Sequence, residues 1–549
     1  MSGPSLTTDE PPTEYSRRKN GFLLRTAKSV SEIQSNINNL ADVLVFLEVL
    51  GYGAKTVREH GFKDMRDLAR QVYEVIDYYN PRSVKGSAPL LYRLPRVSRR
   101  LLEGLALAAP FLMMLPMVFV FGVSLWMDWR LPLGPLTGLA LGVLVGMLTS
   151  EGHVWMFSRL LQFYHSQSNL AETRRVIKRS YSFFALILGA TVAMLFATAS
   201  LTKVPIELFA IAAVATVTMS VHRFSFTVVY TLRKVSLSVL AYGAAFAALL
   251  SVYFLTPDMI PDPVTRYFAS LGVAFLVLSV AAIYSTRKAY APSTSSLNVE
   301  RPNFFKPLFI NKQTLHSRFD IQLWENSPYY LYGAFFIIML FGDRILSWFY
   351  NPDHVVGGQT LPLVFNAPYH MGADIALFVV FPIGLVQYVM GGHMFEMLHN
   401  LSLESPSTDP GVLDKFVRRR YLLTLSASVI ISGAMAAILV LLAPWTMGWL
   451  STAPVSSNIM RVAALGNVFL AVFTVNSSFI ILLNRPKALA AIALVGASIV
   501  GLGGGILGQL GFQDIVFAYL GSCVTAAILS SLVLKRLMRR PGSLFLARF

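Results

Sequence analysis

The stretch from Tyr421 to Ala443 reads YLLTLSASVIISGAMAAILVLLA and contains no lysine, arginine, aspartate or glutamate. A helix needs about 20 apolar residues to cross a hydrocarbon core about 30 Å thick, so this stretch is long enough for one crossing. Three arginines, Arg418 to Arg420, stand directly before it. Because short loops rich in lysine and arginine stay in the cytoplasm, this helix is expected to begin on the cytoplasmic side.

The same pattern recurs along most of the 549-residue chain, of which 54% is hydrophobic and 14% charged. Soluble domains carry about 25% charged residues, so a soluble enzyme is excluded and no enzymatic activity is expected. The sequence predicts an all-α polytopic membrane protein with about 12 transmembrane helices. The expected spans are 104–126, 131–149, 181–200, 204–222, 235–255, 264–286, 328–350, 368–395, 421–443, 459–484, 487–509 and 514–535.

Basic residues gather in alternate loops of the predicted topology. The chain has 46 Lys and Arg against 29 Asp and Glu, a net charge of +17. The positive-inside rule accounts for this excess without nucleic acid as a partner, and it places both termini in the cytoplasm of a bacterial inner membrane. The clusters are Arg174, Arg175, Lys178 and Arg179; Arg223, Arg233 and Lys234; Arg418, Arg419 and Arg420; and Lys535, Arg536, Arg539 and Arg540.

A polar break at 287–327 divides the twelve spans into six and six. His153 and His393 lie 240 positions apart, and so do Tyr181 and Tyr421. These matches predict two parallel six-helix bundles related by an axis along the membrane normal. The expected segments are a disordered tail (1–28), a helical cytoplasmic region (29–100), the first bundle (101–286), a cytoplasmic linker (287–327), the second bundle (328–540) and a C-terminal tail (541–549). The helical region is either a cap or a docking site for a partner enzyme.

Charged residues inside the spans are the first candidates for a functional site, because each costs about 2.5–3.5 kcal/mol at a helix centre. Asp343 and Arg344 lie near the outer end of one span, and Asp374 lies near the outer start of the next. At about 1.5 Å per residue, all three are expected about 10 Å below the outer surface. The predicted cluster has one net negative charge. It suits a structural ion-pair lock or a site for a proton, a sodium ion or a cationic group.

Two other residue sets are weaker candidates. A polar cluster is expected at the cytoplasmic ends of two spans, where its tips would reach water rather than bind a metal; its members are His153, His393, Glu396 and His399. Four tyrosines either line a sugar path or belong to the interfacial aromatic belt: Tyr329, Tyr332, Tyr369 and Tyr388. No phosphate-binding G-x-x-x-x-G-K-[ST] loop and only one cysteine are present, so neither a metal nor another cofactor is expected.

Two motifs in the second half resemble a known family. Pro328-Tyr-Tyr-Leu-Tyr-Gly333 is followed by Asp343-Arg344 and Trp348, and then by Tyr369-x-x-Gly372-x-Asp374. This pattern is similar to that of the inner-membrane exporter subunit of Pel-type exopolysaccharide systems, in the multidrug/oligosaccharidyl-lipid/polysaccharide (MOP) superfamily. The resemblance implies two six-helix bundles and export of a polysaccharide made by a cytoplasmic glycosyltransferase. It also implies accessory membrane subunits and a role in biofilm formation.

Three other functions stay open at this point. The acidic cluster would suit an ion-coupled antiporter of MATE type. A flippase for lipid-linked oligosaccharides is less favoured, because the spans hold few basic residues that could neutralise a pyrophosphate. The chain could also be a non-transporting scaffold for a polysaccharide synthase. A major-facilitator fold is disfavoured by the long link at 150–180, which lacks that family's short Gly-Asp-Arg signature.

Overall fold

The computed structural model describes residues 21–27, 29–30, 40–79, 101–105, 113, 117–128, 130–166, 170–202, 204–232, 234–290, 319–352, 355–356, 359–389, 410–449, 454–539 and 541. The chain divides into two compact units. The smaller contains α2 (Leu40–Val49), α3 (Ala54–Glu59) and α4 (Met65–Tyr79). Its core is formed by apolar side chains from all three helices, among them Leu47, Val57 and Val72. A short helical region was expected here.

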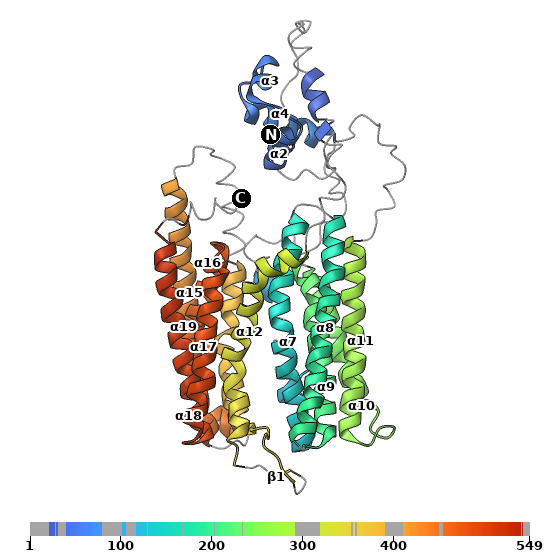
Figure 1. The fold of residues 1–549 in the computed structure, drawn as a ribbon, viewed down its shortest axis with the longest axis vertical. Coiled ribbons are helices and arrows are strands. Elements are labelled where there is room, and N and C mark those ends of the chain that lie inside the picture. The colour runs from blue at the N-terminus through green and yellow to red at the C-terminus, as the bar shows by residue number, and fades with distance from the viewer. Residues whose placement is uncertain are drawn as a thin grey trace. The chain divides into compact units, whose positions relative to one another are not determined.

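The larger unit is built from long helices (Figure 1). The first half contains η2 (Met117–Phe121), α7 (Leu133–Ser166), α8 (Leu170–Thr202), α9 (Ile206–Thr231), α10 (Val235–Leu255) and α11 (Pro263–Tyr290). The second half begins with α12 (Phe319–Phe349), a hairpin of β1 (Val355–Val356) and β2 (Gln359–Thr360), α13 (Ala367–Ala376) and η4 (Leu377–Val379). It continues through α15 (Pro410–Trp449), α16 (Pro454–Leu482), α17 (Pro486–Ser498), η5 (Ile499–Gly503), α18 (Gly504–Gly508), η6 (Phe512–Asp514) and α19 (Ile515–Leu537).

Within the described residues, 11 helices are long and apolar enough to cross a membrane. They correspond to the second through twelfth expected spans. The first, 104–126, is described only at 104–105, 113 and 117–126, where Met117–Phe121 form a π-helical segment. The fold class is therefore confirmed as an all-α polytopic membrane protein. Helices suit this environment because each satisfies its own backbone hydrogen bonds in lipid.

One boundary was wrong. α7 continues to Ser166 rather than ending near 149, and α8 begins only four residues later at Leu170. Residues 150–166 and 170–180 are therefore helical and do not form a long link. The extension is helical because Phe157, Leu161 and Tyr164 recur at helical spacing and enter a buried cluster. A scan for segments of bilayer length cannot detect the part of a helix that continues past the bilayer.

The two halves pack their helices in the same order. In the first, α7 contacts α9, and α9 contacts α11; in the second, α13 contacts α16, and α16 contacts α19. α8 and α15 begin 240 positions apart, at Leu170 and Pro410, whereas α11 and α19 begin 252 apart, at Pro263 and Ile515. The single offset of 240 therefore holds only at the third span of each half. The later offsets grow because the helices are longer in the second half: α15 has 40 residues against 33 in α8, and α16 has 29 against 26 in α9.

Three glycines bring α7 against α9. Gly138, Gly142 and Gly146 are spaced four residues apart, so they lie on one helix face. A Cβ atom at Gly142 would lie 2.3 Å from the carbonyl oxygen of Ala212. The hydroxyl of Thr216 donates to the Gly142 carbonyl at 3.1 Å, so the close approach also carries a hydrogen bond between the helices. Small residues at such crossings are typical of membrane helix packing.

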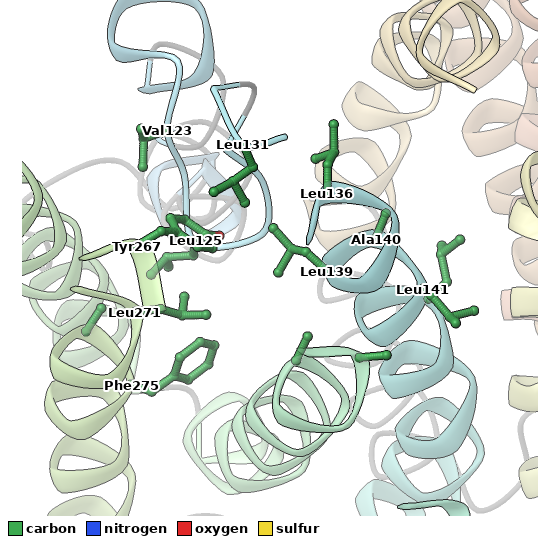
Figure 2. Close-up of a cluster of buried hydrophobic side chains, with 14 of the residues drawn as sticks. Val123, Leu125, Leu131, Leu136, Leu139, Ala140, Leu141, Tyr267, Leu271 and Phe275 are labelled. Carbon is green, nitrogen blue, oxygen red and sulfur yellow. The ribbon is translucent and has the colours of Figure 1, made fainter. Parts of the chain in front are cut away.

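The end of the unit that bears β1 and β2 is called the hairpin end here, and the end near Lys178 is called the basic end. At the hairpin end, Leu125 and Leu131 pack with Leu136 and Leu139 of α7, and with Tyr267 of α11 (Figure 2). The same cluster includes Trp348, Val364 and Phe365 from the second half. The backbone N–H of Phe365 donates to the Thr137 hydroxyl at 3.0 Å. The two halves are therefore in direct contact at this end.

Candidate functional site

Arg344 lies at the centre of a charged cluster near the hairpin end of α12. Its Nη1 donates to Oδ1 of Asp343 at 2.9 Å, and its Nε donates to Oδ1 of Asp374 on α13 at 2.8 Å. Nη1 also donates to the carbonyl oxygen of Leu340 at 2.9 Å. The side chain of Arg344 is 1% exposed, and that of Asp343 is 0% exposed. The guanidinium therefore joins α12 to α13 through Asp343 and Asp374, the two carboxylates that were expected at the same depth in the membrane.

Tyr369 completes the environment of Asp343. Its hydroxyl donates to Oδ2 of Asp343 at 2.8 Å, so each oxygen of this buried carboxylate accepts a hydrogen bond. A buried charge is tolerated when it is paired and hydrogen-bonded in this way. Tyr369 was expected to line a sugar path or an interface. It is fully buried and holds the charged cluster instead.

His370 holds the second carboxylate. The indole N–H of Trp348 can only donate, and it lies 2.9 Å from Nε2 of His370, so that nitrogen must be the acceptor. Nδ1 therefore carries the proton, and it lies 3.1 Å from Oδ2 of Asp374. The imidazole is neutral in this arrangement, because protonating Nε2 would break the bond from Trp348. The cluster of Asp343, Arg344 and Asp374 thus has a net charge of −1.

Asp374 is the accessible member of the cluster. Its side chain is 43% exposed, whereas that of Arg344 is 1% exposed. Among the three charged side chains, that of Asp374 therefore reaches furthest out of the cluster, although both of its oxygens are hydrogen-bonded within it. Asp343 is closed off from any ligand by its burial.

The chain around the cluster is fixed by the connection between α12 and α13. The side chain of Asn366 caps α13 by accepting from the backbone N–H of Tyr369 at 3.1 Å. Its amide also donates to the carbonyl oxygen of Ser347 on α12 at 3.3 Å. Pro368 lies in the first turn of α13, where its missing N–H costs nothing. One residue thus starts α13 and ties it to α12.

The other predicted residues are separate from this cluster. Tyr329 and Tyr332 are buried on α12, and the hydroxyl of Tyr388 donates to Glu103 at 3.1 Å. His153 was expected to reach water at an interface, and this was wrong, because its side chain is enclosed by aromatic rings and is 1% exposed. Its expected partners lie outside the described residues: His393, Glu396 and His399. Among the described residues, no group of three acidic, histidine or cysteine side chains could hold a metal.

A second polar contact, in the first half, was missed. Glu151 on α7 forms an ion pair with Arg223 on α9 and accepts from the indole N–H of Trp155 at 3.0 Å. The ring of Tyr332 on α12 lies 5.1 Å from that of Trp155. Arg223 had been assigned to a basic loop, yet α9 continues to Thr231. The spacing of Glu151 and Trp155, four residues apart on a helix, was the available signal.

Comparison with known proteins identifies the fold. No family model matches the chain, and no curated relative matches it. A MATE structure in the straight conformation aligns with a TM-score of 0.53 at 13% identity, over 81% of this chain and 95% of that one. An inward-facing multidrug resistance MATE transporter of the MOP superfamily aligns at 0.50 and 13%, over 85% and 98%. A MOP superfamily transporter from Pyrococcus furiosus aligns at 0.52 and 14%, over 81% and 95%. At these identities the likeness shows the fold.

Proposed function

We propose that this chain is a membrane transporter that exports a polysaccharide of the Pel type across the bacterial inner membrane, between its two bundles. Two independent observations support the proposal. The fold is that of MOP superfamily transporters. Residues from both sequence motifs that resemble Pel-type exporters also form the charged cluster.

The arrangement of the motif residues carries this proposal. Asp343 and Arg344 come from the first motif, and Tyr369 and Asp374 come from the second. All four belong to one hydrogen-bonded unit, which Trp348 completes through His370. Scattered chance matches would not be expected to converge on one hydrogen-bonded cluster. The motif is therefore best understood as the sequence signature of a working unit that joins α12 to α13.

The proposal includes partners and an orientation. The basic end would face the cytoplasm, where a glycosyltransferase supplies the growing polymer, and accessory membrane subunits would complete the assembly. The unit of α2 to α4 is then available as a docking site for that enzyme. Membrane lipid surrounds the exposed apolar faces of the outer helices, such as Leu441 on α15.

The test compares cells with and without this chain, in a background that keeps the glycosyltransferase. We expect secreted polymer to disappear without the chain and to return with the unmodified gene. The polymer in the medium and the polymer held in the cells would be measured separately. Secretion that continues at the normal level without the chain would contradict the proposal. Loss of synthesis itself, with the enzyme still active in cell extracts, would favour the scaffold.

A second candidate is an ion-coupled antiporter of MATE type, which is favoured by the exposure and net negative charge at Asp374. Purified protein in sealed vesicles discriminates between the two. An antiporter would move a fluorescent organic cation when a proton or sodium gradient is imposed, and Asp374→Asn would abolish that movement. A polymer exporter is not expected to transport such cations. A lipid-linked oligosaccharide flippase would instead move a labelled lipid between leaflets.

The orientation gives a separate prediction. Lys178 is exposed at the basic end, and Asp258 is exposed in the turn between α10 and α11 at the other end. In a Cys523→Ser background, Asp258→Cys is expected to react with a membrane-impermeant maleimide added to spheroplasts, because it would face outward. Lys178→Cys should react only after the membrane is opened. The reverse labelling pattern would invert the topology.

A further inference from the structure

The helices α7 and α12 approach closely at a second place, nearer the basic end. A Cβ atom at Gly152 would lie 2.7 Å from the carbonyl oxygen of Tyr330, and one at Gly333 would lie 2.9 Å from the carbonyl oxygen of Glu151. We call this contact of Gly152 and His153 with Tyr330 and Gly333 the basic-end crossing. Since α7 belongs to the first bundle and α12 to the second, opening a path between the bundles on this side requires the crossing to separate.

His153 lies within the crossing. Its Nδ1 is 3.0 Å from the carbonyl oxygen of Thr149, which can only accept, so Nδ1 carries the ring proton. Nε2 is then a bare lone pair. It is buried, and no described residue forms a hydrogen bond with it. A buried nitrogen without a partner is uncommon in folded proteins and calls for an explanation.

Aromatic rings from three other helices enclose this histidine. Phe183 and Phe184 of α8 lie 5.5 and 5.2 Å from it, Phe224 of α9 lies 6.4 Å away, and Tyr330 of α12 lies 4.9 Å away. All but Tyr330 belong to the first bundle. Of the four rings, only that of Tyr330 therefore moves away from His153 when the crossing separates.

The charged groups nearby leave a proton on His153 uncompensated in the closed crossing. Glu151 on α7 is paired with Arg223 on α9. α8 contributes Tyr181, whose ring contacts Phe224, and α12 contributes Tyr330. Both are neutral near pH 7. None of the described residues supplies a free counter-charge to a cationic imidazole at this buried position, which makes the charge costly.

From this geometry we infer that His153 is a proton-binding site that controls the basic-end crossing. A proton from solution binds Nε2 when the crossing separates and water reaches the ring, and it leaves as the crossing closes. Low pH therefore favours the open crossing, because a ligand shifts an equilibrium toward the state that binds it better. An exposed histidine has a pKa of about 6.5, so lowering the pH from about 7.5 to about 5.5 should raise the open-to-closed ratio about tenfold.

The test measures distances between the bundles in the full chain, in lipid nanodiscs and without substrate. Spin labels are placed at Lys178→Cys on α8 and Lys415→Cys on α15, two exposed positions toward the basic end, in a Cys523→Ser background. We expect the ratio of long to short distances to rise about tenfold at the lower pH. His153→Gln should make the ratio independent of pH. A ratio that does not respond to pH in the unmodified chain overturns the inference.

Two further variants keep the test decisive. His153→Phe fills the ring-lined site without a titrating nitrogen, and it should hold the short distance at both pH values even if His153→Gln folds poorly. His222→Gln is the matched control. His222 is also buried in the first bundle with an unpartnered ring nitrogen, but its described ring contacts, such as Trp126 and Tyr242, lie in its own bundle. If His222→Gln abolishes the response and His153→Gln retains it, the site is assigned wrongly. The distances are independent of polymer export, so either proposal can fail alone.

Discussion

Arg344→Gln is expected to be the most damaging single substitution in the cluster, lowering the free energy of unfolding by about 3–5 kcal/mol. It removes the only cation from two carboxylates, so the net charge falls from −1 to −2, and Asp343 is left fully buried without its counter-charge. Membrane abundance and the unfolding temperature in detergent should both fall sharply.

Asp374→Asn and the double variant are the matched comparisons. Asp374→Asn makes the cluster neutral, and the Asn oxygen can still accept from Nε of Arg344. The Asn amide nitrogen then faces the Nδ1–H of His370, so that one hydrogen bond is lost, and abundance should fall less than for Arg344→Gln. Arg344→Gln with Asp374→Asn restores the net charge to −1 and should recover part of the lost stability. If Arg344→Gln alone is as stable as the unmodified chain, the ion pairs are not important. If Asp374→Asn is abundant but exports no polymer, Asp374 serves transport rather than structure.

Gly142→Val is expected to disrupt the first bundle with an effect comparable to that of Arg344→Gln in the second. The added Cβ would lie 2.3 Å from the Ala212 carbonyl oxygen and 2.5 Å from Cβ of Ala215, closer than real contacts allow. The first is a backbone atom and the second is a Cβ atom bonded directly to the backbone of the same helix, so neither can move aside and α7 and α9 must separate. Overpacking costs about 1–3 kcal/mol or more, and separation also breaks the bond from Thr216 to the Gly142 carbonyl. The expected result is loss of the folded protein from the membrane.

Gly189→Val provides the control for that variant. Gly189 lies on α8 with no heavy atom within 4 Å of the position a Cβ would occupy, so a valine is accommodated there. Both substitutions add the same atoms to a transmembrane helix. Comparing their abundance and detergent unfolding temperatures isolates the effect of the close helix contact. Equal behaviour of the two variants would mean that α7 and α9 do not depend on this approach.

Much of the fold could be predicted because lipid imposes a simple rule on length and composition. Eleven expected spans have counterparts among the described helices, and the depths of Arg344 and Asp374 were enough to bring them together. Depth follows from counting residues along a helix. The position where a helix ends beyond the bilayer cannot be obtained by such counting. The expected span therefore ended at 149, whereas α7 continues to Ser166.

What could not be predicted depends on which face of a helix is buried. His370 lies four residues before Asp374, so their contact could be predicted from helical spacing. The hydrogen bond from Trp348 that fixes the tautomer of His370 joins two different helices, and spacing along one helix cannot predict it. His153 was assigned to a water-exposed cluster because its ring-lined environment is assembled from α8, α9 and α12. The Gly138, Gly142 and Gly146 series was visible in the sequence, whereas its partner helix was not.

A polymer can pass between the two bundles only if they separate, so a covalent link between them should block export. Tyr164 of α7 and Gln322 of α12 are hydrogen-bonded partners toward the basic end. In a Cys523→Ser background, cysteines at both positions would be joined by a short cleavable bifunctional maleimide in exporting cells, with each single cysteine as a control. We expect secretion to stop when the link forms and to resume when the link is cleaved. Undiminished secretion from fully linked protein would contradict passage of the polymer between the bundles.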